Sequence, residues 1–143
     1  MDSRPQTALR IELLHPLASL PQKANPTDAC FDLSACEGYT IEAGSTVKVR
    51  LGWAMQLEHG WEAQIRGRSG LASRGILAHH GTIDHLYRQE VQVILHNLSG
   101  EKFLLEPGDR IAQLTVAPVY PVCLVEAKVE PTERGGFGST GLR

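Results

Sequence analysis

Short runs in which apolar and polar residues alternate recur along almost the whole chain. The run Phe-Asp-Leu-Ser-Ala at residues 31–35 shows the pattern clearly, and residues 46–51 repeat it. Alternation with a period of two places every second side chain on the same face of a β-strand, so each run predicts a strand with one buried face. The predicted strands are residues 10–14, 31–35, 39–42, 46–51, 53–57, 61–66, 82–83, 91–95, 103–105, 110–116 and 122–125.

The segments between these runs carry residues that favour turns. Residues 97–100, for example, read Asn-Leu-Ser-Gly, and residues 84–89 are expected to form a hairpin bend between two strands. Only residues 71–77 suggest a short helical turn. Many short strands at regular spacing indicate an all-β protein, and we predict a jelly-roll-like, distorted β-barrel.

The end of the chain differs from the rest in its high glycine content. Glycine resists ordering, and the glycine-rich segment 135–141 has a single apolar side chain, Phe137, to contribute to a core. We therefore predict one β-barrel domain at residues 1–130, followed by a flexible arm at residues 131–143.

The composition is that of an ordinary globular protein, and it limits the partners. The 143 residues suffice for one domain with its own core. A formal net charge of −2 provides no basic field for nucleic acid or a membrane surface, and no apolar run reaches the ~18 residues of a spanning helix. Three cysteines without a Cys-x-x-Cys pair argue against a disulfide framework and a zinc knot. With no export signal, these features predict a cytoplasmic protein.

One loop has the residue types of an anion-binding site, and a second loop is a tight turn. Arg68, Ser69 and Gly70 follow a predicted strand, and together they offer a guanidinium, a hydroxyl and an approachable backbone amide. The alternative is a helix start that Ser69 caps. The second loop, residues 108–114, leads into a strand, and its alternative is a plain turn in which its aspartate pairs with the neighbouring arginine.

The 84–89 bend begins with an acid and contains an aromatic residue. Asp84 and Tyr87 suit a ligand site, while the alternative is a surface turn in which the Asp84 carboxylate bonds its own backbone. His79, His80 and His85 lie near the bend. Their spacing does not require a metal site, so we interpret them as loop histidines.

Phe137 stands among glycines and hydroxyl residues in the arm. It could stack on a ring of a ligand while Ser139, Thr140 and backbone amides meet oxygen anions. The alternative is a disordered tail.

Five motifs occur in one order and together resemble the trimeric dUTPase (deoxyuridine triphosphatase) family. They are residues 28–33 (DACFDL), 67–72 (GRSGLA), 81–88 (GTIDHLYR), 108–114 (GDRIAQL) and 136–141 (GFGSTG). The resemblance implies a jelly-roll subunit, a homotrimer with active sites shared between subunits, and hydrolysis of dUTP to dUMP and pyrophosphate with Mg²⁺. That reaction keeps uracil out of DNA and supplies dUMP for thymidylate synthesis.

The resemblance also implies a role for each matching residue. Asp84 would activate the water that attacks the α-phosphorus, a task suited to a carboxylate that accepts a proton. Tyr87 would pack on the deoxyribose and exclude a ribose 2′-hydroxyl. The backbone of Gly81, Thr82 and Ile83 would contact uracil and exclude the methyl group of thymine.

The remaining implied roles concern the triphosphate. The residues that would hold phosphate oxygens are Arg68, Ser69, Gly70 and Gln113. The triphosphate itself would hold Mg²⁺, and Asp32 would contact the ion indirectly, through a bound water. The arm residues that would close over the nucleotide are Arg134, Phe137, Gly138, Ser139 and Thr140. Among them, Arg134 would hold the γ-phosphate and Phe137 would stack on uracil.

Some positions depart from the family pattern, namely Leu86, Gln89, Ala78 and Cys30. Leu86 and Gln89 replace a usual acid and glycine in the bend and are expected to reshape it. Ala78 removes a polar contact near the base, and Cys30 is a packing change. The spacing between Arg134 and Phe137 is about two residues shorter than usual, so we expect a weakened lid.

Two other functions fit the same residues. One is a dCTP deaminase-like, possibly bifunctional enzyme of the same fold, although that chemistry needs a glutamate base beside the pyrimidine. The other is a non-catalytic homologue that binds a nucleotide or a protein partner. Asp84 argues against it, since a pure binding protein needs no catalytic base.

Overall fold

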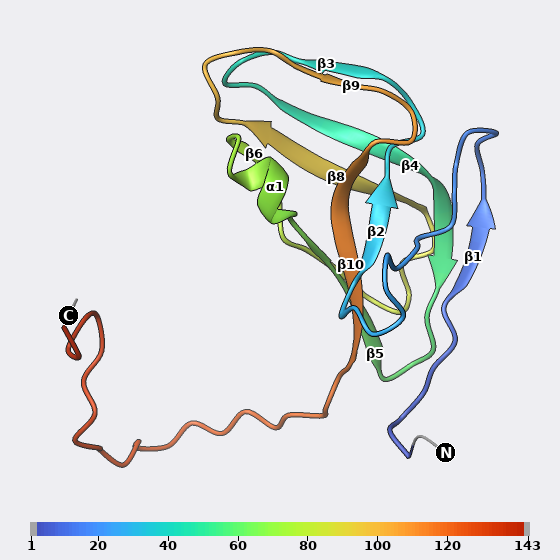
Figure 1. Ribbon diagram of the computed structural model, residues 1–143. Helices are drawn as coiled ribbons and strands as arrows, with labels where there is room; N and C mark the ends of the chain where they lie inside the picture. The colour runs from blue at the N-terminus through green and yellow to red at the C-terminus, as the bar shows by residue number, and fades with distance from the viewer. Residues whose placement is uncertain (1–2, 142–143) are drawn as a thin grey trace.

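The protein is built almost entirely of β-strands. Figure 1 shows the computed structural model, which describes residues 3–141. The predicted all-β fold is confirmed. The elements are β1 (Arg10–Leu13), β2 (Phe31–Ser34), β3 (Tyr39–Ile41), β4 (Thr46–Gln56), β5 (Trp61–Arg66), α1 (Ser69–Ala72), β6 (Ile76–Ala78), β7 (Gly81–Ile83), β8 (Glu90–Asn97), β9 (Phe103–Leu105) and β10 (Arg110–Pro118).

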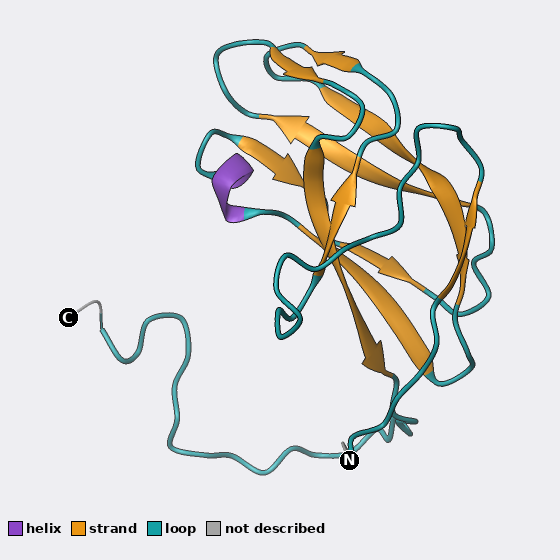
Figure 2. Ribbon diagram, turned by 45° about the vertical axis from the view of Figure 1, so that its right-hand side comes forward, coloured by secondary structure: helices purple, strands orange, loops and turns teal. Residues whose placement is uncertain are grey.

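The strands form three antiparallel sheets. The strand orders are β1-β4-β8-β6, β2-β10-β5-β7 and β3-β9. After each of the described strands the chain crosses into a different sheet, so no strand pairs with its neighbour in sequence (Figures 1 and 2). This is the jelly-roll-like arrangement expected, but the described sheets share no strand and the barrel is loose rather than closed.

The core lies between the sheets and is made of the apolar positions of the alternating runs. Leu33 of β2, Leu95 of β8 and Leu114 of β10 are fully buried, together with Trp53 of β4. Their sequence neighbours Asp32 and Gln113 are only partly buried. Strand alternation thus packs one face of each strand and leaves the other face for polar side chains.

Residues 46–51 and 53–57 were predicted as separate strands, but they form one strand with an irregularity. Arg50 pairs with Gln92 and Ala54 pairs with Glu90, so β4 has three residues where β8 has one. Gly52, at the centre, has φ +75°. A positive φ bends the strand without ending it, and the sequence pattern breaks there for that reason.

The hairpin predicted at residues 84–89 is wrong. The strand before it, β7, pairs with β5, whereas β8 pairs with β4 and β6 in another sheet. Residues 84–89 are therefore a connection between two sheets. The sequence pattern predicted the strands β7 and β8 themselves, but alternation does not indicate which strand each of them pairs with.

The helical turn predicted at residues 71–77 is displaced and shorter. The helix is α1, four residues long, and residues 76–78 form β6, which pairs with β8. Gly75, with φ +83°, separates the two elements. Ile76 is buried and supplies the apolar contact that favours a strand here.

The strand predicted at residues 122–125 is absent. This segment is extended, without ladder pairing, and Val122, Leu124 and Val125 are exposed. Although apolar and polar residues alternate in this segment, it pairs with no strand among residues 3–141. Beyond β10 the chain runs away from the sheets (Figure 1). The last two residues of the predicted arm, 142–143, and the first two of the predicted domain, 1–2, lie outside the described residues.

All three cysteines, Cys30, Cys36 and Cys123, are free thiols, as expected. Burial raises the pKa of Cys36, whose thiol lies beside the Gly52 irregularity. No helix among residues 3–141 has the length and apolar character needed to cross a membrane.

Candidate active site

Asp32 and Gln113 lie side by side on the outer face of the second sheet. They are paired across the β2–β10 ladder, and Gln113 also pairs with Arg66 of β5. The Gln113 side-chain amide donates to the carbonyl of Gly67 at 2.8 Å. This bond ties β10 to the start of the loop that carries Arg68, so two sequence-predicted site residues are placed beside that loop.

Two arginines flank the Asp32 carboxylate. Arg68 Nε lies 3.5 Å from Asp32 Oδ1, and Arg110 Nη1 lies 3.5 Å from Asp32 Oδ2. Arg68 also donates from Nη1 to the main-chain oxygen of Arg110 at 3.0 Å. The ion pairs are long and partly exposed, so they are weak, and both guanidinium groups keep donors available for another anion.

The loop around α1 differs in one respect from what the sequence predicts. Arg68, not Ser69, is the N-cap residue, and the helix start has no side-chain cap. The alternative role of Ser69 as a cap is therefore wrong. Ser69 and Gly70 are exposed at the first turn, where backbone N–H groups have no intrahelical acceptor. A hollow of about 540 Å³ beside them is lined by Arg68, Arg74 and Arg110 among others.

The alternative interpretation of the 108–114 loop is also wrong. Asp109 does not pair with Arg110, because its carboxylate accepts from the main-chain N–H of Glu106 at 2.9 Å and closes the turn. Arg110 turns to Asp32 instead.

Asp84 leaves the end of β7 with its carboxylate free. The turn that follows uses the main-chain oxygen of Asp84, which accepts from the Tyr87 N–H at 3.0 Å. The carboxylate itself has no hydrogen-bond partner among residues 3–141 and is exposed to solvent. The alternative of a self-capping aspartate is therefore wrong. Buried Ile83 anchors the strand immediately before it.

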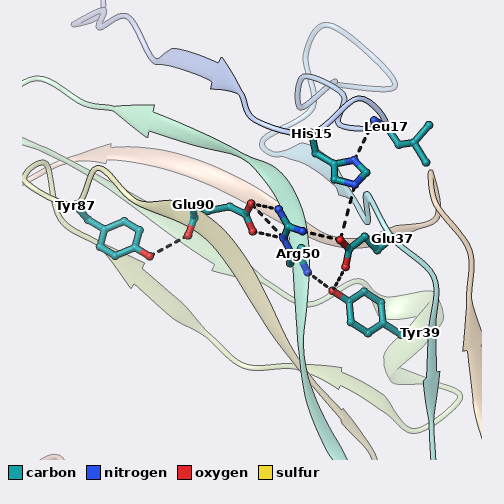
Figure 3. A network of polar contacts seen from close by, with 7 residues as sticks. All are labelled: His15, Leu17, Glu37, Tyr39, Arg50, Tyr87 and Glu90. Atoms are coloured by element: carbon teal, nitrogen blue, oxygen red, sulfur yellow. Dashed lines mark hydrogen bonds and ion pairs between the residues drawn. The ribbon is translucent and has the colours of Figure 1, made fainter.

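Tyr87 is 42% exposed, and its hydroxyl donates to the main-chain oxygen of Glu90 at 2.9 Å (Figure 3). Gly81 pairs with Ile65 of β5, and an added Cβ would make an ordinary van der Waals contact with the Ile65 side chain, at 3.4 Å. Thr82, opposite Gln64, is exposed.

The structure does not bring the two groups of residues together within one chain. Ile65 of β5 pairs with Gly81 and Ala63 with Ile83, while Arg66 is level with Gln113. Asp84 follows Ile83 and therefore lies beyond the far end of β7, about 13 Å along the strands from the level of Gln113. The loop with Asp84 and Tyr87 and the cluster around Arg68 lie at different ends of the sheet.

The arm residues lie apart from both groups. Phe137 is fully exposed, and residues 136–141 form local turns through hydrogen bonds from Ser139 to Gly136 and from Gly141 to Gly138. Arg134, Gly138 and Thr140 are exposed as well. Figure 1 shows the arm extending away from the sheets of its own chain.

Sequence reasoning missed Arg110 as a neighbour of Asp32, and it missed Arg50 and Glu90, which contact each other and support Tyr87. Arg110 lies in a motif that was singled out, but it is 78 positions from Asp32 along the chain. Only the β2–β10 pairing brings them together. Arg50 and Glu90 carry no motif that could have identified them.

Among residues 3–141, no group of three or more histidine, cysteine or acidic side chains could hold a metal ion. Asp32 offers one carboxylate between two cations. Mg²⁺ retains several waters and is commonly bound through one or two carboxylates plus substrate phosphates, so these residues fit an ion that arrives on a triphosphate.

The comparisons with known proteins agree with the motifs. The profile of the dUTPase family matches residues 17–141. The deoxyuridine 5'-triphosphate nucleotidohydrolase of Helicobacter pylori (strain P12) is 41% identical over 140 residues, covering 94% of this chain and 97% of the relative. The enzyme of the same name from Hydrogenobaculum sp. (strain Y04AAS1) is 44% identical over 142 residues, covering 94% and 99%.

The fold also matches solved structures. The Staphylococcus bacteriophage 80alpha dUTPase G164S mutant with dUpNHpp has a TM-score of 0.80 to this chain, with 24% identity, and the match covers 94% of this chain and 99% of the phage protein. These matches do not favour a dCTP deaminase. With the family profile covering most of the chain and relatives above 40% identity over nearly their full length, the chain belongs to the dUTPase family.

Proposed function

We propose that this member of the dUTPase family hydrolyses dUTP to dUMP and pyrophosphate, with Asp84 as the catalytic base. The observation that carries the proposal is the free, exposed carboxylate of Asp84 at the end of an anchored strand. A carboxylate without a competing hydrogen bond can accept a proton from water and orient it toward the α-phosphorus, in line with the leaving pyrophosphate.

Arg68, Ser69, Gly70 and Gln113 hold the triphosphate in this proposal. The long contacts of Arg68 and Arg110 to Asp32 support it, because phosphate oxygens can replace them with shorter, charge-assisted bonds. The triphosphate would carry Mg²⁺, and Asp32 would hold the ion indirectly, through a bound water. The ion would neutralise charge on the triphosphate as the α-phosphorus is attacked.

Tyr87 and the backbone of Gly81, Thr82 and Ile83 select the nucleoside. Tyr87 lies one turn after Asp84 and covers the sugar, so that a ribose 2′-hydroxyl has no room. Residues 81–83 are fixed by pairing with β5, which supports a backbone that leaves no room for the methyl group of thymine.

The active site is completed between copies of the chain. Asp84 and Arg68 lie at different ends of the sheet, and the arm lies away from both, which supports sites shared within a homotrimer. In this proposal residues 1–130 form the body, and residues 131–143 form an arm that closes over a nucleotide. Phe137 stacks on uracil, and Arg134 reaches the γ-phosphate, with Gly138, Ser139 and Thr140 beside the phosphates.

The test is pyrophosphate release from dUTP with Mg²⁺, compared with dTTP, dCTP and UTP, for the natural chain and Asp84→Asn. We expect selective turnover of dUTP, reduced at least ~100-fold in the variant, because general-base catalysis contributes about 10²–10⁴-fold. Ammonia release from dCTP would point to a deaminase. Binding of dUTP without any turnover would contradict hydrolysis and indicate a nucleotide-binding homologue.

A further inference from the structure

A chain of polar contacts connects Tyr87 through Glu90 of β8 to Arg50 of β4 (Figure 3). The Tyr87 hydroxyl donates to the main-chain oxygen of Glu90 at 2.9 Å. The carboxylate of the same Glu90 accepts from Arg50, from Nε at 2.9 Å and from Nη2 at 2.8 Å. Glu90 thus contacts Tyr87 with its backbone and Arg50 with its side chain.

The side-chain contact of Glu90 with Arg50 lies where the β4–β8 ladder is irregular. Glu90 is the first residue of β8, and its pairing with Ala54 lies beyond the irregularity at Gly52. Arg50 lies on the other side of that irregularity, where it pairs with Gln92. The Arg50–Glu90 pair therefore bridges the irregularity and holds the main chain that accepts the Tyr87 hydroxyl. The bonds are two-pronged, and the Glu90 side chain is only 17% exposed.

Arg50 is held from its far side as well. Its Nη1 lies 2.6 Å from Glu37 Oε1, and its main-chain N–H donates to the Tyr39 hydroxyl at 3.0 Å. That hydroxyl donates to Glu37 Oε2 at 3.2 Å. His15 Nε2 lies 3.8 Å from Glu37. The guanidinium of Arg50 also lowers the pKa of Glu90, so the pair is charged at neutral pH.

We propose that Arg50 and Glu90 are positioning residues that fix Tyr87 and thereby set the discrimination between deoxyribose and ribose. The inference rests on the proposed function. Tyr87 is substantially exposed on its loop, and its hydroxyl bond to Glu90 is its link to β8. An aromatic ring excludes a ribose hydroxyl group only if the ring cannot move aside. The rigidity of the Glu90 main chain, which holds the Tyr87 hydroxyl, therefore determines the selectivity for deoxyribose over ribose.

The test compares Glu90→Ala and Tyr87→Phe with the control Glu37→Ala. Glu37 contacts the same guanidinium but not Tyr87. The measured quantity is kcat/KM for dUTP divided by kcat/KM for UTP, with the Tm of each variant. We expect this ratio to fall about three- to tenfold in Glu90→Ala and in Tyr87→Phe, the effect of one lost hydrogen bond. In Glu37→Ala the ratio is unchanged even where the Tm falls.

The double variant of Glu90→Ala and Tyr87→Phe should lower the ratio no further than Tyr87→Phe does, because the position of the Glu90 carbonyl matters to Tyr87 only through the hydroxyl that Tyr87→Phe removes. Two outcomes would overturn the proposal and leave Glu90 a purely structural residue. In one, the double variant lowers the dUTP/UTP ratio by the product of the two single effects. In the other, Glu90→Ala and Glu37→Ala have the same dUTP/UTP ratio.

A second readout does not depend on turnover. The chain has three tyrosines, so protein labelled with carbon-13 tyrosine gives few ring signals in an NMR spectrum. The signal that disappears in Tyr87→Phe is that of Tyr87. Glu90→Ala should shift or broaden it, and Glu37→Ala should not. An unmoved signal in Glu90→Ala would also overturn the proposal. Absence of dUTP turnover in the natural chain would instead refute the proposed function, so the two failures are distinct.

Discussion

Gly52 and Gly44 have almost the same backbone conformation but opposite surroundings. Their φ values are +75° and +76°. A Cβ on Gly52 would lie 2.8 Å from the Cβ of His15 and 2.9 Å from Cys36 Sγ, whereas a Cβ on Gly44 would meet nothing within 4 Å. Comparing alanine substitutions at the two positions therefore separates the cost of a positive φ from the cost of overpacking the interior.

We expect Gly44→Ala to lower the free energy of unfolding by about 1–2 kcal/mol, the cost of a left-handed conformation for an L-residue. Gly52→Ala should cost about 1–3 kcal/mol more, since the added methyl group also overpacks the interior. Urea unfolding of both variants checks the difference. Equal losses would mean that the neighbours of Gly52 move aside freely.

At the scale of elements, one ion pair secures the β4–β8 ladder. The hydrogen bonds of Arg50 lower the pKa of Glu90 in the folded protein, and partial burial only partly opposes them. A group with a lowered folded pKa stabilises the fold above its unfolded pKa, about 4.3 for glutamate, and this contribution is lost as the pH falls through the folded pKa.

Glu90→Gln should therefore lower the Tm at pH 7 and have progressively less effect as the pH falls below about 4. At pH 7 the expected loss is ~1 kcal/mol, because Arg50 is partly exposed and solvent weakens the pair. Thermal unfolding from pH 3 to pH 7 measures it, with exposed Glu130→Gln as the control. A difference that stays constant with pH would contradict a charged Glu90.

The sequence predicts most of the individual elements, because alternation is a local property. It fails where the outcome depends on a distant partner. Residues 76 and 77 were predicted to end a helical turn, yet they belong to β6 because they pair with β8. Residues 122–125 alternate just as well and remain unpaired. Asp32 was predicted as a site residue from its motif, while its contact with Arg110 depends on a pairing that no local pattern reveals.

At the scale of the whole molecule, the arm is separate from the body in its contacts. The side chains of residues 131–141 are all exposed, and the backbone hydrogen bonds at Gly136 and Gly138 are local turns. The arm therefore contributes little to the stability of its own chain, and its contribution is expected in binding and catalysis.

A chain ending at residue 130 should keep the Tm of the full chain and lose at least about tenfold in kcat/KM for dUTP, because the lid that excludes water is gone. Arg134→Ala in the full chain should raise KM. If Arg134→Ala leaves both steady-state constants unchanged, its role at the γ-phosphate is refuted. A lower Tm of the shortened chain would show that the arm packs on the body.

The crossing of the chain between sheets after every strand has a consequence for the order in which the protein forms. Strand β2 has one partner strand in its sheet, β10, which begins at Arg110. Apart from the isolated bridge between Asp32 and Gln22, a growing chain carries residues 31–34 without a partner strand until most of the sequence has been synthesised. Folds dominated by such distant pairings fold slowly. Because Asp32 lies on β2 and Gln113 on β10, these two residues of the candidate site come together only when the final strand joins its sheet.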